Sequence, residues 1–546
     1  MKKIIRILLI SFCMFFLFSC SLEDFISTDE PEKEKEQEKE SDSNTDSKTD
    51  NDNQSSHLVI IEANDVHGYI MQDENGRGGI SNMAYSINKI RKQYGDDNVL
   101  LIANGDMFQG TGLVRMSMGQ VMIDIMNEMK FDAACLGNHE FDWDLPVILN
   151  YFDGDASNGE ANFPLVNSNV KQNGALVTDQ NIVETAIFDK AGIKVGFIGL
   201  IGDVKSSINA LFADKYTFDT SFNYLLTELA NHLKGEGADI IVVSIHDGDA
   251  DEAKNFSFNK ICAQLKDSNG NYLIDAVING HTHTHQATKI NRTGGVALPI
   301  VQSRPYASNQ LYEFGRIDLE IENKKVTNCS TDHISATSSG AFYDKNTQNV
   351  LNEYYERDKE FLETPIVYSS NYINRYGDEL HSWVSSVMLH VTDADFALCN
   401  TGGMRANIAA GDIKFEDIYQ LNPFDNYIIM HQVSKSKIET FLEQNEGYYF
   451  YDYKDSQSAS KETLTVAVVD YVYYSSYYKN CRLENNKCYD TSIILRDALI
   501  MDLKARNRFN IYSDYESVLT KQVSNIEYSN LYYVAFDNKK YIYGLV

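Results

Sequence analysis

The chain has 546 residues and is strongly acidic, with 78 Asp and Glu against 48 Lys and Arg and a formal net charge of −30. This length exceeds one ordinary domain, and a hydrophobic content of 43% suffices for packed cores, so two or three domains are expected. The charge argues against nucleic acid as a partner, because the chain has no excess of basic residues to displace counterions from a phosphate backbone.

Residues 1–20 have the pattern of a bacterial export signal. Lys2 and Lys3 precede a largely apolar stretch, Ile4–Phe18, which is too short for a comfortable transmembrane helix. The stretch leads to Cys20, which resembles the lipidated Cys of a bacterial lipoprotein, although Phe18 is bulkier than the residues common there. The alternative is an ordinary cleaved signal with an incidental Cys. We expect an exported protein, periplasmic or at the cell surface, held to a membrane by a lipid anchor.

Residues 21–56 form a predicted acidic tether. From Glu30 to Ser56 the segment is polar and contains no aliphatic residue. Such a composition cannot bury enough apolar surface to offset the entropy of folding. The segment is therefore expected to stay unfolded and to hold the folded part of the chain away from the membrane.

Five short apolar runs follow, and each leads to polar residues of the kind that bind metals. The runs, each typical of a buried strand, are Leu58–Ile61, Val99–Ile102, Ala133–Leu136, Ile240–Val243 and Ala276–Ile278. The polar residues are Asn64-Asp65-Val66-His67, Asn104-Gly105-Asp106, Gly137-Asn138-His139-Glu140, His246-Asp247 and Gly280-His281-Thr282-His283. Taken singly, each fragment is more often a plain loop or a helix cap. Since sites in open α/β sheets lie beyond the carboxyl ends of strands, we expect the five loops to converge from one sheet edge.

The residue types indicate the chemistry of this pocket. Carboxylate and amide oxygens mixed with imidazole suit Mn, Zn, Fe or Co, and the absence of Cys among the five loops disfavours a structural zinc site. A carboxylate such as Asp106 can bridge two cations. Two metals ~3.5–4 Å apart clamp a phosphoryl group and activate water near neutral pH. The pattern predicts metal-assisted hydrolysis at phosphorus.

The series of motifs resembles the calcineurin-type metallophosphoesterases, and Gly137–Asp142 is similar to their 5′-nucleotidase branch. The resemblance extends from about His57 to the C-terminus. It implies an α/β fold in which a metallophosphoesterase β-sandwich flanked by helices, at residues 57–336, is followed by a second α/β substrate-binding domain, at 364–546. The apolar spacing between Tyr343 and Glu363 indicates an amphipathic helix, which the resemblance identifies as the linker within residues 337–363.

The resemblance implies two divalent metal ions, with Mn, Zn, Co or Mg as candidates. One would be held by Asp65, His67, Asp106 and His283, and the other by Asp106, Asn138, His246 and His281. His139 would not be a ligand but would face the phosphate, where it stabilises developing charge and assists the leaving group. Asp142, three residues later, would orient that imidazole. The alternative for Asp142 is a plain carboxylate at a helix N-terminus.

The second domain has a signature of its own. Asn400-Thr401-Gly402-Gly403-Met404-Arg405 follows the strand-like run Phe396–Cys399, where glycines permit close backbone approach and an Arg can bind phosphate oxygens. The alternative is a glycine turn with a solvated Arg. By resemblance to the 5′-nucleotidase C-terminal domain, the residues that contact the nucleotide are Arg375, Asn400, Arg405 and Phe424, the last by stacking on the base.

The segment Tyr471–Tyr478 departs from the family pattern. Relatives carry a second stacking aromatic, then a glycine pair and an Asp that holds the ribose. Tyr471 can supply the second ring, but the glycines are missing and Tyr477 stands where the Asp is expected. The alternative is a Tyr-rich β-strand, in which most of these side chains have no contact with substrate.

Two cysteines near this segment leave a pair of alternatives open. Cys481 and Cys488 flank a polar stretch, Arg482–Lys487, and a disulfide between them would close a hairpin. The other alternative is two free thiols in a loop.

We therefore expect an exported hydrolase that removes phosphate from nucleotides by attack of a metal-bridging hydroxide. The nearest alternative is the same chemistry on a 2′,3′-cyclic nucleotide, a UDP-sugar or another nucleotide diphosphate. A second is a metal-dependent hydrolase of a non-nucleotide phosphoester, which the altered Tyr471–Tyr477 stretch keeps open. A third, of another class, is an inactive surface-binding lipoprotein, and the intact set of ligand residues argues against it.

Overall fold

The computed structural model describes residues 55–73, 75–247, 258–305, 313–336, 341–482, 488–513 and 516. The predicted signal peptide at 1–20 with Cys20, and nearly all of the tether at 21–56, lie outside the described residues. The first described strand begins at Ser55, two residues before the predicted boundary. Within the described part of the chain, no helix is long and apolar enough to cross a membrane.

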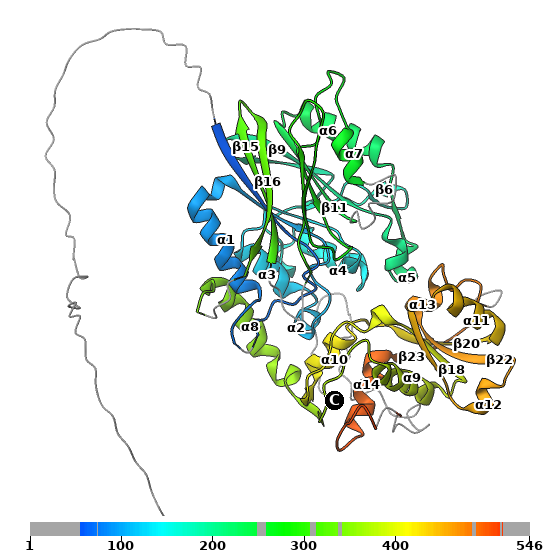
Figure 1. Ribbon diagram of the computed structural model, residues 1–546. Helices are drawn as coiled ribbons and strands as arrows, with labels where there is room; N and C mark the ends of the chain where they lie inside the picture. Colours follow the sequence, from blue (N-terminus) through cyan, green and yellow to red (C-terminus); the bar gives the residue numbers. More distant parts are fainter. Residues whose placement is uncertain are drawn as a thin grey trace, which may run out of the picture. The chain divides into compact units, whose positions relative to one another are not determined.

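The amino-terminal domain contains two β-sheets that pack face to face (Figure 1). The seven-stranded sheet has the order β16 (Lys325–Ser335), β15 (Glu313–Glu322), β1 (Ser55–Ala63), β2 (Val99–Asn104), β3 (Ala133–Cys135), β4 (Leu165–Val166) and β7 (Ile182–Val183). The six-stranded sheet has the order β13 (Gln286–Ile290), β14 (Leu298–Gln302), β12 (Ala276–Asn279), β11 (Ile240–His246), β9 (Ile193–Ile201) and β8 (Thr185–Lys190).

All five predicted strands are present, but they do not share one sheet. β1, β2 and β3 run parallel in the first sheet, and β11 and β12 run parallel in the second. The expectation of a single sheet edge is therefore wrong. The reason is that strands buried on both faces read as continuous apolar runs, so their pattern does not reveal which sheet each one joins.

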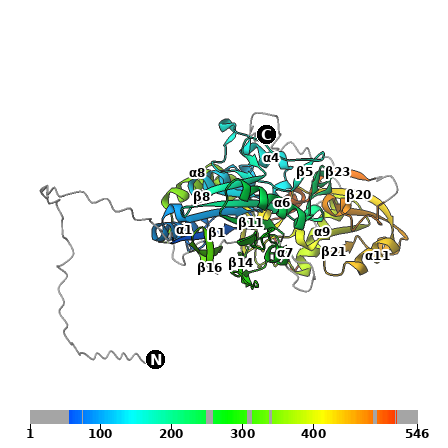
Figure 2. The ribbon, with the colours of Figure 1, turned by 90° about the horizontal axis from the view of Figure 1, so that it is seen from above.

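Helices cover the outer faces of both sheets, as Figures 1 and 2 show for α1 beside β1, and as α6 does where it packs against β9 and β8. The helices of this domain are α1 (Ile80–Tyr94), α2 (Gly112–Met116), α3 (Gln120–Glu128), α4 (Leu145–Leu149), α5 (Ala210–Ala213), α6 (Phe222–Gly235) and α7 (Phe258–Gln264). A small three-stranded sheet consists of β10 (Tyr216–Phe218), β5 (Val170–Gln172) and β6 (Ala175–Leu176).

Alternation along the strands shows how these layers form. On β1, Val59 packs in a core with residues of α1 and α3, whereas its neighbour Leu58 packs against the second sheet. On β11, Val242 joins Leu58 in the core between the sheets, and Ile241 packs with α6 and α7. Because successive side chains point to opposite faces, each strand belongs to two cores, and the layers follow the order helix, sheet, sheet, helix.

Helix α1 illustrates why these segments become helical. Ile80, Met83 and Ile87 recur at spacings of three and four and are buried on one face. Gly79 precedes the helix with a φ of 80°, and a Cβ there would lie 2.8 Å from backbone atoms of Met71. Only glycine fits this close approach, and the helix begins directly after it.

The predicted linker is helix α8 (Lys345–Leu362). The side chain of Asp344 accepts a hydrogen bond from the backbone N–H of Thr347 at 2.9 Å and caps the helix. Leu351 and Leu362 are buried in the core of the amino-terminal domain, and Phe361 also packs against the core of the domain that follows. The amphipathic face therefore connects the two hydrophobic cores.

The carboxy-terminal domain is a second α/β unit, in which α9 lies beside β21 (Figure 2). Its five-stranded sheet has the order β21 (Tyr449–Tyr453), β18 (Phe396–Asn400), β22 (Thr463–Val469), β20 (Tyr427–Ser434) and β23 (Tyr489–Ile494), and a two-stranded sheet pairs β17 (Pro365–Ser369) with β19 (Gly411–Lys414). Its helices are α9 (Asp378–Thr392), α10 (Phe415–Leu421), α11 (Lys435–Gln444), α12 (Ser456–Ala459), α13 (Asp470–Tyr474) and α14 (Leu495–Lys504). The predicted fold class is thus confirmed.

The segment after β22 is a helix, so the alternative of a Tyr-rich strand is wrong. β22 pairs with β20 up to Val469, and α13 then begins at Asp470, whose side chain accepts a hydrogen bond from the backbone N–H of Tyr471 at 2.7 Å. Val472 and Tyr473 are buried in the domain core. Tertiary packing here overrides the β-propensity of the tyrosines.

Cys481 and Cys488 are free thiols, so the alternative of a disulfide between them is wrong. The thiol of Cys481 lies 3.5 Å from the backbone oxygen of Lys437, and the thiol of Cys488 lies 4.0 Å from the hydroxyl of Tyr474. The two sulfur atoms therefore have separate surroundings.

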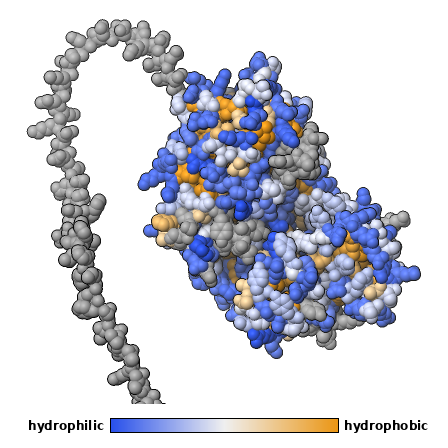
Figure 3. All heavy atoms as spheres, viewed as in Figure 1, coloured by the Kyte–Doolittle hydropathy of each residue, from blue (hydrophilic) through white to orange (hydrophobic). Residues whose placement is uncertain are grey.

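The face drawn in Figure 3 is largely hydrophilic, with apolar residues in scattered patches, which fits the acidic composition.

A buried ion pair in the second domain should contribute strongly to its stability. Asp502 in α14 is fully buried and accepts hydrogen bonds from the indole N–H of Trp383 at 2.8 Å and from Nε of Arg506 at 2.9 Å. We expect Asp502→Ala to lower the free energy of unfolding by about 3–5 kcal/mol, because the Arg506 charge stays buried without its partner. Urea unfolding followed by circular dichroism measures the loss.

Glu439→Ala is the matched control for this variant. Glu439 pairs with Lys435 at 3.7 Å on an exposed face of α11, so its removal should cost only about 0–1 kcal/mol. Equal losses in the two variants would contradict the importance of the buried pair.

Candidate functional site

The predicted metal ligands lie in loops that leave the carboxyl ends of parallel strands in both sheets. Asp65 and His67 follow β1, Asp106 follows β2, Asn138 follows β3, His246 ends β11, and His281 and His283 follow β12. Backbone hydrogen bonds join the first two loops, from the N–H of Asp65 to Gly105 at 3.1 Å and from the N–H of His67 to Asp106 at 2.9 Å. The structure thus brings all seven residues to one place.

Five of these residues have a left-handed backbone conformation. The φ angles are 51° at Asp65, 49° at His67, 55° at Asp106, 72° at His281 and 55° at His283. Such angles are uncommon outside glycine, although Asp and His tolerate them better than most residues. Each costs on the order of 1–3 kcal/mol and persists only where the surroundings enforce it, as happens at functional sites.

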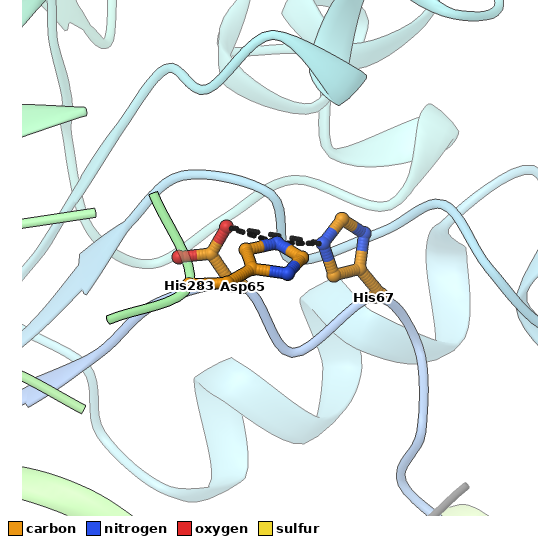
Figure 4. A group of neighbouring side chains, drawn as sticks. All are labelled: Asp65, His67 and His283. Carbon is orange, nitrogen blue, oxygen red and sulfur yellow. Dashed lines mark hydrogen bonds and ion pairs between the residues drawn. The ribbon is translucent and has the colours of Figure 1, made fainter. Parts of the chain in front are cut away.

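A first cluster consists of Asp65, His67 and His283 (Figure 4). Oδ1 of Asp65 lies 3.1 Å from Nε2 of His283 and 3.8 Å from Nε2 of His67, and the two imidazole nitrogens lie 3.3 Å apart. Asp65 and His67 are buried, whereas the side chain of His283 is 35% exposed. The three side chains point their donor atoms at one small volume.

A second cluster forms around Asp106. Its Oδ2 lies 3.2 Å from Nε2 of His246 and 3.9 Å from Nε2 of His67, so this carboxylate stands between the two clusters. His281 completes the group, and its Nδ1 lies 2.7 Å from Oδ1 of Asn138. The second cluster therefore combines a carboxylate, two imidazoles and an amide.

Backbone carbonyls fix how two of the imidazoles face the site. Nδ1 of His246 lies 2.7 Å from the carbonyl oxygen of Asn104, and Nδ1 of His67 lies 3.1 Å from that of Gln109. Since a carbonyl only accepts, each Nδ1 must donate, which leaves Nε2 unprotonated in the neutral ring. Such outer hydrogen bonds are typical of metal-binding His.

Two buried atoms at the centre of the site have no hydrogen-bond partner among the described residues. They are Nε2 of His246 and Oδ1 of Asp65. A buried polar atom without a hydrogen bond is costly, and each such case needs a physical reason. Cations bound between the two clusters would satisfy both atoms, and the mixed oxygen and nitrogen donors fit divalent metals of the Mn, Zn or Co type.

The charge states of the site fit cation binding. Burial disfavours the charged form of both carboxylates, but His283 beside Asp65 and His246 beside Asp106 hold both pKa values below their ordinary range. Burial lowers the pKa of His67 and, with the nearby charge of His246, lowers that of His281 to about 4. Burial opposes protonation of His246, but the charges of Asp106 and Asp65 outweigh it and raise the pKa of this imidazole to about 10. The site thus presents anionic carboxylates with His67 and His281 in the neutral form that binds metals, and a cation that binds at His246 must displace its proton.

Glu140 has a role that the sequence analysis missed. Its buried carboxylate accepts hydrogen bonds from the backbone N–H groups of Asp106 and Met107, both at 2.9 Å, and of Gly137 at 2.6 Å. Burial raises the pKa of Glu140 to about 7. The side chain ties the loop after β2 to the loop after β3. The only signal in the sequence was an acidic residue directly after His139. The residue type alone does not distinguish a carboxylate that holds two loops together from one that binds a metal.

His139 and Asp142 form the expected pair. Nδ1 of His139 lies 2.7 Å from Oδ2 of Asp142, across a short 3₁₀ helix, His139–Phe141. Burial opposes protonation of His139, but the charges of Asp142 and Asp106 outweigh it and raise the pKa of the imidazole. The ring lies 5.0 Å from that of His67 and 5.8 Å from that of Phe424, centre to centre. His139 therefore stands between the two clusters and the second domain.

A cavity of about 590 Å³ adjoins the clusters. Four of the predicted substrate-binding residues line it, namely Asn400, Arg405, Phe424 and Tyr471, together with His139 and Asp142. Nη2 of Arg405 lies 3.5 Å from Nε2 of His67. Arg375 is not among the lining residues and instead donates a hydrogen bond to the backbone carbonyl of Arg405. The structure thus places four of the five at the cavity and Arg375 behind one of them.

Asp470 is a further lining residue that the sequence analysis did not single out. Its buried carboxylate accepts hydrogen bonds from Nδ2 of Asn426 at 2.8 Å and from Nδ2 of Asn209, in the first domain, at 3.0 Å. Burial raises its pKa from 3.8 to about 6. The sequence carried no signal for this contact, because the three residues meet only through the tertiary structure.

Two protein families match the chain. The calcineurin-like phosphoesterase family matches residues 58–285, and the 5′-nucleotidase C-terminal domain matches residues 361–513. Together the two matches span more than half of the chain.

Relatives of similar length match both domains. The chain is 26% identical over 430 residues to Protein UshA of Yersinia enterocolitica, and this match covers 70% of this chain and 75% of that protein. It is 26% identical over 429 residues to a 5′-nucleotidase of Vibrio cholerae, with coverage of 70% and 75%.

Solved structures show the same fold. A 5′-nucleotidase precursor from Thermus thermophilus has a TM-score of 0.66 at 18% identity and covers 83% of this chain and 97% of its own. A 5′-nucleotidase from Candida albicans has a TM-score of 0.59 at 14% identity and covers 82% and 98%. At these identities the likeness establishes the fold alone.

The fold, the clustered carboxylates and imidazoles and the two family matches define a metal-dependent phosphoric ester hydrolase. The chain belongs to the 5′-nucleotidase family, with a calcineurin-like phosphoesterase domain followed by a 5′-nucleotidase C-terminal domain.

The pKa of Asp470 leads to a pH-dependent effect on stability. Because its folded pKa of about 6 exceeds the ordinary 3.8, Asp470 favours folding most below pH 3.8, and this contribution is lost as pH rises through 6. Asp470→Asn removes the titration. We expect the difference in Tm, variant minus wild type, to increase from pH 4 to about pH 7, as measured by scanning calorimetry. A difference that stays constant over this range would contradict the assignment.

Proposed function

We propose that this protein is an exported, lipid-anchored nucleotidase that uses two divalent metal ions. The observation that carries the proposal is the position of Asp106, whose carboxylate stands between two groups of metal-binding side chains at the wall of a cavity lined by Phe424 and Arg405. A phosphoester in that cavity would have its phosphate at the clusters and its remaining part toward the second domain.

The residues fit a pair of cations that share Asp106. In the proposal the first ion is held by Asp65, His67, Asp106 and His283, and the second by Asp106, Asn138, His246 and His281. Oδ1 of Asp65 and Nε2 of His246 support this arrangement, because both are buried without a hydrogen bond among the described residues and lie within ion-pair distance of other proposed ligands, His283 and Asp106. When bound, such metals neutralise phosphate charge and make water a nucleophile near neutral pH. Mn, Zn, Co and Mg are the candidates.

His139 and Asp142 are proposed to act on the reacting phosphate. The raised pKa of His139 favours a protonated imidazole, which can donate to an oxygen on which negative charge develops. Asp142 fixes the ring by accepting from Nδ1, so Nε2 remains for the substrate. Arg405, with its guanidinium 3.5 Å from Nε2 of His67, adds a positive charge at the same end of the cavity.

The second domain is proposed to bind the nucleoside. Phe424 offers an aromatic face in the cavity, and Tyr471 also lines it, with its hydroxyl donating to the backbone carbonyl of Ser206 at 3.1 Å. A base stacked on such rings is held by ~1–3 kcal/mol. Asn400 adds a side-chain amide to the wall. A volume of about 590 Å³ lies in the usual range for small-molecule sites of ~300–1,000 Å³.

The proposed location rests on the sequence outside the described residues. Lys2, Lys3 and the apolar Ile4–Phe18 fit an export signal, and Cys20 fits a lipid attachment site. The acidic segment at 21–56 would then place the enzyme at a distance from the membrane surface.

His139→Ala separates chemistry from metal binding. We expect kcat for AMP to fall by ~10²–10⁴ with unchanged metal content, because the imidazole acts on the phosphate and is not assigned as a ligand. His139 also lies in a group with His67 and Asp106, so metal analysis of the purified variant decides between the two roles. Loss of one ion per chain would make His139 a ligand.

Asp106→Asn is the control for this experiment. Since Asp106 is proposed to bridge, its amide variant should lose metal from both sites along with activity. An Asp106→Asn enzyme with its full metal content and near-native turnover would overturn the shared-ligand arrangement.

Phe424→Ala tests the class of substrate. We expect the KM for AMP to rise about 5- to 150-fold, which corresponds to the energy of stacking one base. The rate with p-nitrophenyl phosphate should change little, because this small ester reaches the clusters without a base pocket. Steady-state kinetics with a panel of mono-, cyclic and diphosphate nucleotides gives the measurement.

Two outcomes would contradict the nucleotidase proposal. One is an equal effect of Phe424→Ala on AMP and on p-nitrophenyl phosphate. The other is a native enzyme that prefers p-nitrophenyl phosphate to every nucleotide in the panel. Either result would favour a general phosphoesterase.

A further inference from the structure

A third group of metal-binding side chains lies outside the proposed active site. His285, Glu313 and His333 bring their donor atoms within 4.8 Å of one another. Among the described residues, every other group of this kind contains Asp65 or Asp106. The proposed phosphoester chemistry uses none of these three residues.

The topology of the sandwich brings the three residues together. His285 precedes β13 in the six-stranded sheet, whereas Glu313 begins β15 and His333 lies on β16 in the seven-stranded sheet. In the β15–β16 register, Glu313 pairs with Ser335 and Gly315 pairs with His333. Glu313 and His333 are therefore diagonal neighbours on one face of the strand pair. The group joins the two sheets.

The donor atoms are close enough to share one ion. Nε2 of His285 lies 2.9 Å from Oε1 of Glu313, and the rings of His285 and His333 lie 3.9 Å apart, centre to centre. Bonds of ~2.0–2.2 Å from zinc to nitrogen and oxygen place two ligand atoms roughly 3 Å apart. Small side-chain rotations suffice to bring the third donor to the same distance.

Neighbouring backbone groups orient the side chains. Nε2 of His333 lies 3.1 Å from the carbonyl oxygen of Gln302 and must donate to it, so Nδ1 is the unprotonated nitrogen of the neutral ring. Oε1 of Glu313 accepts from the backbone N–H of Arg304 at 3.2 Å. Hydrogen bonds of this kind commonly hold metal ligands in position.

We propose that His285, Glu313 and His333 bind one divalent cation of the zinc type. Two imidazoles and a carboxylate are a donor set that such ions prefer, and the partial exposure of His285, at 39% of its side chain, leaves a coordination position for water. The ion cross-links the two sheets. It also lies beside the loop of His281 and His283, because Thr282 and Thr284 of that loop donate to the side chain of Gln302.

Zinc stoichiometry of the full-length protein tests this site. Purified wild type and His333→Ala are equilibrated with Zn²⁺ and dialysed, and bound zinc is measured by elemental analysis. We expect the variant to hold one ion per chain less than wild type. Activity with p-nitrophenyl phosphate should stay near that of wild type, since His333 contacts no residue of the proposed active site in the contacts described.

Glu313→Gln provides a second variant of similar shape. It keeps the size of the side chain but removes its charge, and we expect the affinity for this zinc ion to fall by more than the ~10–100-fold that loss of an outer hydrogen-bond partner costs. His232→Ala is the matched control. His232 pairs with Glu236 at 3.5 Å on the surface, and no third donor joins them in the described part of the chain.

The outcomes of this zinc-binding experiment can be told apart from those of the experiments that test the proposed function. A loss of one zinc in His333→Ala and a weaker ion in Glu313→Gln, with His232→Ala unchanged, support the site even if nucleotides prove to be poor substrates. Equal zinc content and affinity in wild type and in both variants would overturn it. A similar loss in His232→Ala would also overturn it, since the effect would then come from surface histidines in general.

Discussion

The burial of two carboxylates among imidazoles is the constraint on which the rest of the amino-terminal domain depends. Asp65 and Asp106 lie 0% and 1% exposed, and charges in such a place are tolerated only when partners surround them. The partners come from loops after strands of both sheets, and several of them hold left-handed backbone angles. The site is therefore stable only where the scaffold is rigid and cations or protons balance its charge.

The sandwich supplies that rigidity. The strands that precede the loops are buried on both faces, and Glu140 joins two of the loops through three backbone N–H groups. The close packing leaves no room for larger side chains at the glycines beside the proposed metal ligands. A Cβ on Gly105 would lie 2.6 Å from Nδ1 of His246, and one on Gly137 would lie 2.3 Å from Oδ1 of Asp106. Glycine is thus required at both positions, because any larger residue would clash with these side chains.

The second domain reaches the site through charge as well as through the cavity. Asp425 accepts hydrogen bonds from Arg115 of α2 at 2.6 Å and from Arg496 of α14 at 2.5 Å, so one carboxylate links the two domains. It follows Phe424 directly, and this contact therefore fixes the chain that presents the aromatic ring to the cavity. The proposed substrate-binding residue Phe424 and the residue that joins the two domains are thus neighbours in the chain.

The sequence by itself determined the five strands that precede the metal-binding loops, the linker helix α8 and the fold class, because apolar periodicity is a local property that burial enforces. Its motifs also named residues that the structure brings together around Asp65 and Asp106. Only the tertiary structure decided that the strands divide between two sheets, that Tyr471 lies on a helix, and that Arg375 lies behind Arg405. The contacts of Glu140 and Asp470 likewise could not be predicted from the sequence. In each case the outcome depends on which distant segments pack together, and no local pattern of residues encodes that choice.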